Sequence, residues 1–429
     1  MKRKSFPVGV LLFAAAQPLL LTCTAAPAAG EASAAPQTPS VSPSSTAAQP
    51  TAGTGPAEPW LAVRGGAGTD QAWGVDTDSR GNIYWATFQQ PEHQPFADMV
   101  IYKFAPDGTE LWQSRWGGRY MEKAFIVTVA EPFVYVGGLT YTSPVDLMQA
   151  DMAVLALNTD DGRVAWDFTW GRGFGYEEVD GLVVDGESIF LSGWTTGEKT
   201  GVDVAILKLD LQGNLLWVNS WGSDGWDQGD GQMVVDDDAI YVCGRYNGSN
   251  ILLGGQGLLV RFSKADGGYE GHTVWDGPVG TDALGMASDG THLYTVGLTV
   301  DRGDGGQIFV RKWDKEFRLI WERLWGGTGS EEARAIAVGP QGDLFIAGAS
   351  DSLPGAGQKD IVLLRYDRDG ALIRQLSWGG PYIDAAHGIS VDEDRILIAG
   401  NVKHTAGGFD DAILISAGAE AGRFPSFPG

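Results

Sequence analysis

The chain has few cysteines and few basic residues. Two of its 429 residues are cysteine, which excludes a disulfide framework and a cysteine-based zinc site. It carries 30 Lys and Arg against 54 Asp and Glu, a net charge of −24. Recognition of a phosphate backbone needs concentrated basic residues. Nucleic acid is therefore excluded as a partner.

Long apolar runs are also scarce. Residues 6–21 form an apolar stretch that follows three basic residues at positions 2–4 and is too short for a comfortable membrane span. This order predicts an export signal over residues 1–23. Its end, Leu-Leu-Thr-Cys, resembles a bacterial lipobox, in which the cysteine is acylated and becomes the new N-terminus. The resemblance implies lipidation of Cys23, and cleavage at an alanine such as Ala26 is the alternative.

Residues 24–57 lack aromatic side chains and carry one charge, Glu31. They contain 11 Ala, 6 Pro and 10 Ser or Thr. Such a segment cannot bury enough apolar surface to order itself, and frequent proline keeps it extended. We predict a disordered tether between a lipid anchor and a folded domain at residues 58–429.

The folded part of the chain repeats itself. The marker is Trp-x-x-x-Trp-Gly, whose second slot recurs seven times at intervals of 50 to 54 residues, and 11 of the 16 Trp occupy its two slots. The second slots are Arg64, Trp116, Trp170, Trp221, Trp275, Trp325 and Trp378.

Each repeat holds four short apolar runs. In the third repeat they cover residues 181–185, 188–193, 203–209 and 215–221. Their length, their β-branched and aromatic content and the Gly and Asp between them predict strands, and no helical periodicity follows residue 58. We therefore predict an all-β fold, a seven-bladed β-propeller of four-stranded antiparallel blades.

The ends of the repeat region predict how the ring closes. The last repeat has three strands and no Trp-bearing fourth strand, while a surplus strand of that pattern precedes the first repeat at residues 59–66. We predict that the N-terminal strand completes the last blade, which removes two exposed sheet edges.

The repeat resembles the bacterial SBBP β-propeller repeat over roughly residues 59–416. The pattern Gly-Gly-x-x-x-Asp/Glu-x-Ala occurs at 65–72 and 326–333, and Gly-x-Ile-Tyr occurs at 81–84. Such repeats are found in exported and cell-surface bacterial proteins. The resemblance implies a propeller and an envelope location, and it implies no particular activity.

The fourth strand is similar to the tryptophan-docking pattern of quinoprotein-like propellers. The segment from Ala156 to Trp166 is the closest copy. In that family the pattern holds blades together. Quinone-dependent dehydrogenases typically have eight blades and an adjacent cysteine pair, so the resemblance implies docking without the cofactor.

Familiar catalytic motifs are missing as well. There is no nucleophile elbow, zinc-protease helix, P-loop or dinucleotide fingerprint. The Asp-rich segments 224–230 and 301–304 leave calcium open as a ligand, although neither has EF-hand spacing. We predict no cofactor other than calcium.

An acidic position follows the second Trp slot in every repeat. We expect these side chains to form a rim at the channel mouth, where they either accept backbone N–H groups and tie blades together or attract a cation. The rim residues are Asp70, Glu122, Glu177, Asp227, Asp282, Glu331 and Asp384.

A further slot of each first strand varies in chemistry from repeat to repeat. Mixed side chains on a repeated frame are candidates for ligand or partner contacts. Those we select are Trp73, Asp180, Asp230, Arg334 and His387.

We interpret the chain as a monomeric, lipid-anchored scaffold at a bacterial outer membrane or cell surface that binds an envelope protein or carbohydrate without catalysis. A periplasmic or secreted soluble protein is the alternative location. The alternative function is a hydrolase or lyase in which carboxylates at the channel mouth act as acid and base.

Overall fold

The computed structural model describes residues 41–43 and 58–426, apart from positions 67, 92–93, 147, 198–200, 249–254, 278, 301–304, 354–356, 406–407 and 420–423. The predicted export signal with Cys23, most of the predicted tether and the Asp-rich segment 301–304 lie outside the described residues. Within the tether, Val41–Pro43 forms a short strand, β1, that pairs with the outer strand β6. The described residues contain no helix capable of crossing a membrane.

All described elements are strands, and each repeat contributes them in the same order. The first strands are β3 (Gln71–Thr77), β7 (Glu122–Ala130), β11 (Glu178–Asp185), β15 with β16 (Trp226–Gln228, Met233–Val235), β20 (Gly280–Ser288), β24 (Glu331–Val338) and β28 (Ala385–Val391). The second strands are β4 (Ile83–Gln89), β8 (Phe133–Tyr141), β12 (Ser188–Thr196), β17 (Ala239–Gly248), β21 (His292–Val300), β25 (Leu344–Ser350) and β29 (Arg395–Lys403). The third strands are β5 (Asp98–Phe104), β9 (Ala150–Asn158), β13 (Val202–Asp210), β18 (Gln256–Ser263), β22 (Gly306–Asp314), β26 (Asp360–Tyr366) and β30 (Asp410–Gly418). The fourth strands are β6 (Glu110–Trp116), β10 (Val164–Trp170), β14 (Leu215–Trp221), β19 (Tyr269–Trp275), β23 (Leu319–Trp325), β27 (Leu372–Trp378) and, before the first repeat, β2 (Trp60–Arg64).

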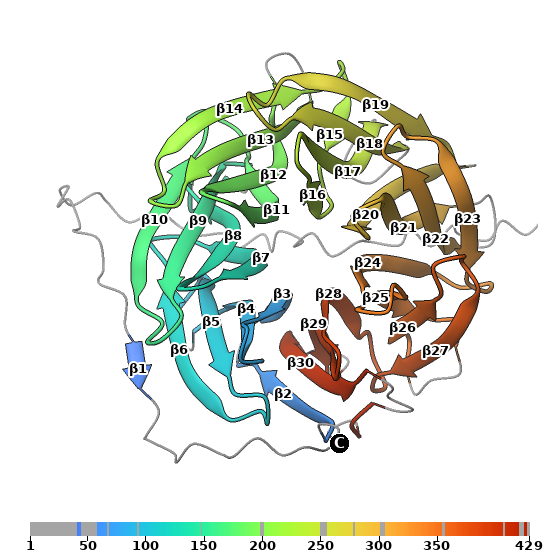
Figure 1. The fold of residues 1–429 in the computed structure, drawn as a ribbon. Helices are drawn as coiled ribbons and strands as arrows, with labels where there is room; N and C mark the ends of the chain where they lie inside the picture. The colour runs from blue at the N-terminus through green and yellow to red at the C-terminus, as the bar shows by residue number, and fades with distance from the viewer. Residues whose placement is uncertain are drawn as a thin grey trace, which may run out of the picture. The chain divides into compact units, whose positions relative to one another are not determined.

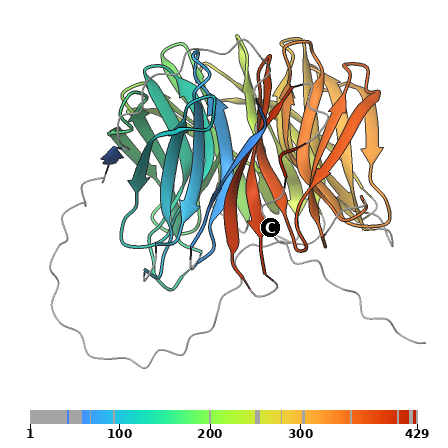
Figure 2. The ribbon, with the colours of Figure 1, turned by 90° about the horizontal axis from the view of Figure 1, so that it is seen from below.

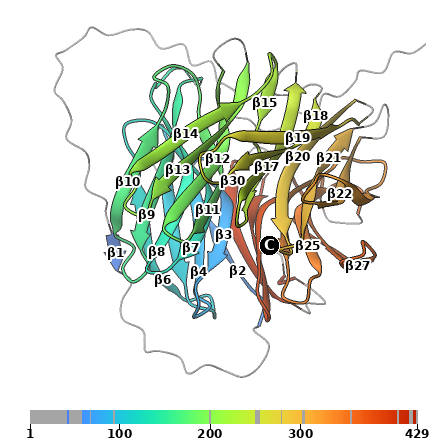
Figure 3. The ribbon, with the colours of Figure 1, turned by 45° about the horizontal axis from the view of Figure 1, so that its top comes forward.

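The four strands of a repeat form an antiparallel sheet, and β2 is the fourth strand of the last repeat. One-residue parallel bridges join neighbouring repeats between Val202 of β13 and Trp226 of β15, between Ala150 and Tyr176, and between Lys359 and Ile383. First strands lie innermost, and fourth strands such as β10, β14 and β19 lie outermost (Figures 1 and 3). Each first strand contacts that of the next repeat, and β28 contacts β3. β2 pairs with β30, from Trp60 opposite Ser416 to Arg64 opposite Ala412 (Figure 2). The all-β, propeller-type prediction is confirmed.

Tryptophans of the first slot fasten one repeat to the next. The Trp112 indole covers Gly162 in the turn between the third and fourth strands of the following repeat, and its Nε1 donates to the Thr159 carbonyl at 3.2 Å. The same arrangement recurs for Trp60 on Gly108, Trp166 on Gly213 and Trp217 on Gly267. A Cβ on any of these four glycines would lie 2.7–2.8 Å from the indole, and their φ angles run from 71° to 87°. Glycine is therefore required on two grounds, space and backbone conformation.

The first strands share one irregularity. Six of them shift register against the second strand by one residue, which is a β-bulge, and the first strand of the fourth repeat is interrupted at the same place. A bulge leaves one residue out of the ladder and turns its side chain away from the sheet's normal alternation. The residues left out are Trp73, Phe125, Asp180, Leu284, Arg334 and His387, and Asp230 lies in the interruption.

The bulge explains why a glycine recurs within most second strands. A Cβ on Gly297 would overlap the carbonyl oxygen of Asp282 in the facing first strand. A Cβ would overlap a first-strand carbonyl oxygen in the same way at Gly138, Gly193, Gly244, Gly348 and Gly400. In each case the carbonyl belongs to the residue two positions before the bulged residue, or before Asp230 in the fourth repeat. The first repeat has Thr87 instead, whose hydroxyl donates to the Val100 carbonyl at 2.8 Å.

We predict that Gly297→Ala lowers the free energy of unfolding by about 1–3 kcal/mol, because overpacking here displaces backbone and not a flexible side chain. Chemical denaturation monitored by tryptophan fluorescence measures the change. Gly418→Ala is the control, since the nearest atom to its added Cβ is 3.9 Å away. Equal stabilities of the two variants would contradict this account of the repeated glycine.

Candidate functional site

The bulged residues bring the predicted ligand contacts together near the common axis of the first strands. Trp73 stacks on His387 with ring centres 4.2 Å apart, and the Arg334 guanidinium lies 5.3 Å from the Trp73 ring. These three residues come from the first, last and sixth repeats. Asp180 and Asp230 come from the third and fourth. We call Trp73, Asp180, Asp230, Arg334 and His387 the bulge cluster.

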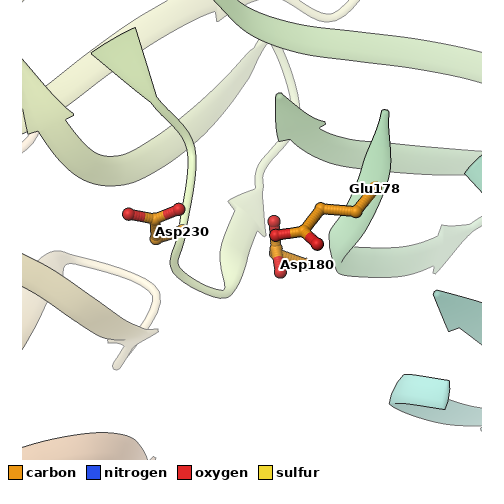
Figure 4. A group of neighbouring side chains, drawn as sticks. All are labelled: Glu178, Asp180 and Asp230. Atoms are coloured by element: carbon orange, nitrogen blue, oxygen red, sulfur yellow. The ribbon is translucent and has the colours of Figure 1, made fainter. Parts of the chain in front are cut away.

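Three neighbouring carboxylates, those of Glu178, Asp180 and Asp230, form the acidic side of this cluster (Figure 4). We call these three side chains the carboxylate group. Glu178, Asp180 and Asp230 each offer an oxygen, and these oxygens lie within 4.8 Å of one another. Tyr176 Oη and Trp194 Nε1 donate to Glu178 at 2.9 and 2.6 Å. Within the described part of the chain, the buried Oδ2 of Asp180 accepts no hydrogen bond.

The carboxylates of this group resist ionisation. Burial raises the pKa of Asp180 well above its usual range, and the charges of Glu178 and Asp230 raise it further. Burial and Asp282 raise the pKa of Asp230 to about 8, against the opposing effect of Arg245, which lies 3.8 Å away. Burial also raises the pKa of Glu178. The group therefore holds protons at neutral pH that an incoming cation would displace.

The opposite side of the cluster is basic. Burial by itself would raise the pKa of Glu332, but Arg334 and Lys359, each 3.6 Å from its Oε1, lower it overall. Burial and Arg334 lower the pKa of His387 to about 3, so its imidazole is neutral. His387 Nε2 donates to Asn401 Oδ1 at 2.5 Å. A neutral, stacked histidine positions Trp73 and is a poor proton donor.

Six of the predicted rim carboxylates are buried and bonded to backbone. Asp384 shows the pattern: it accepts Gly380 N at 2.5 Å from the turn before its strand and Lys403 N at 3.0 Å from the end of the second strand. Comparable bonds to N–H or hydroxyl groups reach Asp70, Glu122, Glu177, Asp227 and Glu331. These side chains fasten turns within a repeat and have little surface to offer a ligand.

Asp282 does not belong with these six, and its placement in the rim is wrong. In register, Thr281 opposite Thr299 takes the position that Glu122 opposite Thr140 takes in the second repeat. Asp282 lies one residue further along, faces the axis and approaches Arg245 Nη1 at 3.6 Å. The spacing hid this because one rim position is a threonine and loop lengths differ between repeats.

The Asp-rich segment 224–230 does not form a calcium loop. Asp227 accepts the backbone N–H groups of Ser223 and Asn247, and Asp230 belongs to the carboxylate group across the bulge. In the described residues, the oxygens of Glu178, Asp180 and Asp230 are the one arrangement suited to a hard cation.

Sequence reasoning missed Glu178, Glu332 and Arg245. Glu178 and Glu332 stand two residues before the bulge, so they share a face with the bulged residue. This two-residue spacing is visible in the sequence and could have identified both glutamates. Arg245 lies on a second strand, and only the pairing of Arg245 with Gln228 brings it to the axis.

No protein-family model and no curated protein matches the chain. The resemblance to the SBBP repeat therefore stays a prediction. Among solved structures, the hydrazine synthase of Kuenenia stuttgartiensis superimposes with a TM-score of 0.51 at 11% identity, covering 76% of this chain and 92% of that one. An acylaminoacyl peptidase of Pyrococcus horikoshii gives 0.46 at 10% identity over 81% of this chain, which spans about half (51%) of the peptidase chain. Identities this low concern the fold alone.

We predict that the protein is more stable at pH 5 than at pH 8. Burial raises the pKa of Asp70 and Asp384 to about 6 and that of Glu122 to about 7. The folded state then binds more protons than the unfolded chain between about pH 4 and 7, so the free energy of unfolding falls as pH rises. His387 acts in the opposite sense, since unfolding lets it take up a proton below about pH 6.5, but it is one group.

Differential scanning calorimetry between pH 5 and 8 measures this dependence. Glu122→Gln should flatten it, because glutamine does not titrate, while the exposed Glu393→Gln serves as the matched control. A melting temperature that rises steadily toward pH 8 would show that the buried carboxylates do not govern stability.

Proposed function

We propose that the chain is an exported, lipid-anchored envelope scaffold whose seven-bladed propeller binds a partner through the bulge cluster. The observation that carries the binding site is that bulged residues meet: Asp180 with Asp230, and Trp73 with Arg334 and His387. All of them stand at positions where the residue type changes from repeat to repeat. A frame that repeats its structural residues while varying one turned-in side chain is suited to recognition.

The chemistry of the cluster favours a cationic group of the partner. Asp180 and Asp230 offer carboxylate oxygens, and Trp73 and Phe125, whose ring centres lie 5.4 Å apart, offer an apolar wall. An ammonium group on an alkyl stem matches both features. Because Asp230 has a pKa of about 8, such a group would release protons on binding and bind more tightly as pH rises.

We predict that tetralysine binds in a salt-sensitive manner and that Asp180→Asn and Asp230→Asn each weaken it about tenfold, the effect of one charge-assisted hydrogen bond. Isothermal titration calorimetry in two buffers of different ionisation enthalpy measures affinity and proton release. Calcium chloride in the same experiment tests the metal alternative.

Asp384→Asn is the control for this experiment. Its carboxylate bonds to backbone, so the variant should lose stability and keep its affinity for tetralysine. Unchanged tetralysine binding in both bulge-cluster variants would remove the proposed site.

A hydrolase or lyase is the second candidate, and the three converging carboxylates favour it. Groups with separated proton affinities can serve as acid and base. The neutral His387 and the hydrogen bonds that fix Glu178 count against it. Turnover of a glycoside or uronide that disappears in Asp180→Asn would decide for the enzyme.

The proposed ring closure rests on the N-terminal strand. Four contacts support it: β2 pairs with β30, β28 contacts β3, Asp70 N donates to the Asp410 carbonyl at 2.8 Å, and Trp60 covers Gly108 as other tryptophans cover their glycines. An anchor at Cys23 would then be joined, through the tether over residues 24–57, to the strand that closes the ring.

We predict that deleting residues 58–66 lowers the melting temperature far more than deleting residues 24–57. The first deletion removes the five-residue strand β2 and the burial of Trp60, worth roughly 1.5–3 kcal/mol on its own, whereas the second removes only the three-residue strand β1 from the outer strand β6. Calorimetry on both deletion variants gives the comparison. Equal melting temperatures would refute closure by this strand.

A further inference from the structure

We propose that a chamber behind the bulge cluster binds a small uncharged polyhydroxy molecule of monosaccharide size. The chamber has a volume of about 300 Å³ and is lined by residues of the first strand of every repeat. Its residues follow the bulge along each strand, whereas Glu178 and Glu332 precede it. Trp73, which stacks on His387 in the bulge cluster, also lines the chamber. Figure 3 shows β3, β7, β11 and β20, four of the contributing strands.

The charge of the chamber selects against ionic ligands. Asp76 is the only ionisable residue among the described residues of its lining. The Asp76 carboxylate accepts Thr77 N and Val129 N, both at 2.8 Å, so each of its oxygens already has one backbone donor. The lining has no cation for an anionic ligand, and a cationic ligand would find a carboxylate that is committed elsewhere.

Two polar side chains of the lining remain available. Neither the Gln232 amide nor the Ser390 hydroxyl hydrogen-bonds to another residue that the structure describes, whereas the Thr128 hydroxyl donates to the Leu182 carbonyl at 2.9 Å. An amide and a hydroxyl each donate and accept, which is the pairing that ligand hydroxyl groups need. These two groups come from the fourth and last repeats and therefore reach the chamber from different sides.

The rest of the chamber lining is apolar, which suits the C–H faces of a sugar ring. Trp73, Met233 and Met286 line the chamber together with aliphatic side chains. A pyranose ring carries C–H faces between its hydroxyl groups, and such faces pack on indole and thioether surfaces. The volume stands at the lower end of the range for ligand pockets. A single sugar ring with a few waters fits it.

The test uses D-glucose, D-galactose and N-acetyl-D-glucosamine as neutral probes and gluconate as the charged one. Titration calorimetry and tryptophan fluorescence should show saturable binding of at least one neutral sugar and none of gluconate. Gln232→Met, which keeps the side chain's length, should weaken that binding roughly tenfold, while the exposed Gln341→Met should not. Ser390→Ala, which removes one oxygen, gives the second measurement if Gln232→Met does not fold.

The outcomes separate this site from the bulge cluster. Asp180→Asn should retain the sugar response, because Asp180 is not among the chamber residues. Absence of binding by all three sugars, or equal affinity in the wild type, Gln232→Met and Ser390→Ala, would overturn the proposal and leave the cationic site untouched.

Discussion

The close approach of the first and second strands in each repeat is the constraint on which this structure depends. Where the bulge occurs, a first-strand carbonyl occupies the space that a side chain of the second strand would fill, so glycine stands there in six repeats. That contact fixes the bulge, and the bulge turns one residue out of the ladder toward the axis. The candidate site is therefore a consequence of backbone packing, and its chemistry is free to vary.

The same logic separates structural carboxylates from available ones. Those at the start of six first strands accept backbone N–H or hydroxyl groups, which offsets part of the cost of their burial. Asp180, Asp230 and Asp282 face the axis, have no such donors among the residues that the structure describes, and have guanidinium groups or each other as neighbours. In a protein with a net charge of −24, most of the rim carboxylates thus stabilise turns, and a few other carboxylates lie beside the axis.

Departures from the repeat follow from packing between neighbours. The fourth repeat has Gly271 where others have the docking tryptophan, and the next repeat has Phe317 where others have the glycine. Phe317 adopts a φ of 63° and packs edge-on against Tyr241. The aromatic ring at this contact therefore comes from the turn of the fifth repeat and not from the fourth strand of the fourth repeat. In the sixth repeat Arg374 replaces the tryptophan, and the repeat after it has no turn between third and fourth strands to cover.

The sequence by itself determined the strands, their grouping into repeats and the all-β, propeller-type fold, because periodic Trp, Gly and Asp report local conformation and packing that recur in every repeat. It also singled out Trp73, Asp180, Asp230, Arg334 and His387 as a variable slot. Only the tertiary structure decided that these residues meet, that Glu178 and Arg245 join them, and that Asp282 leaves the rim. Those facts depend on register across strands and on distances between repeats, and neither quantity is encoded in spacing along a single chain.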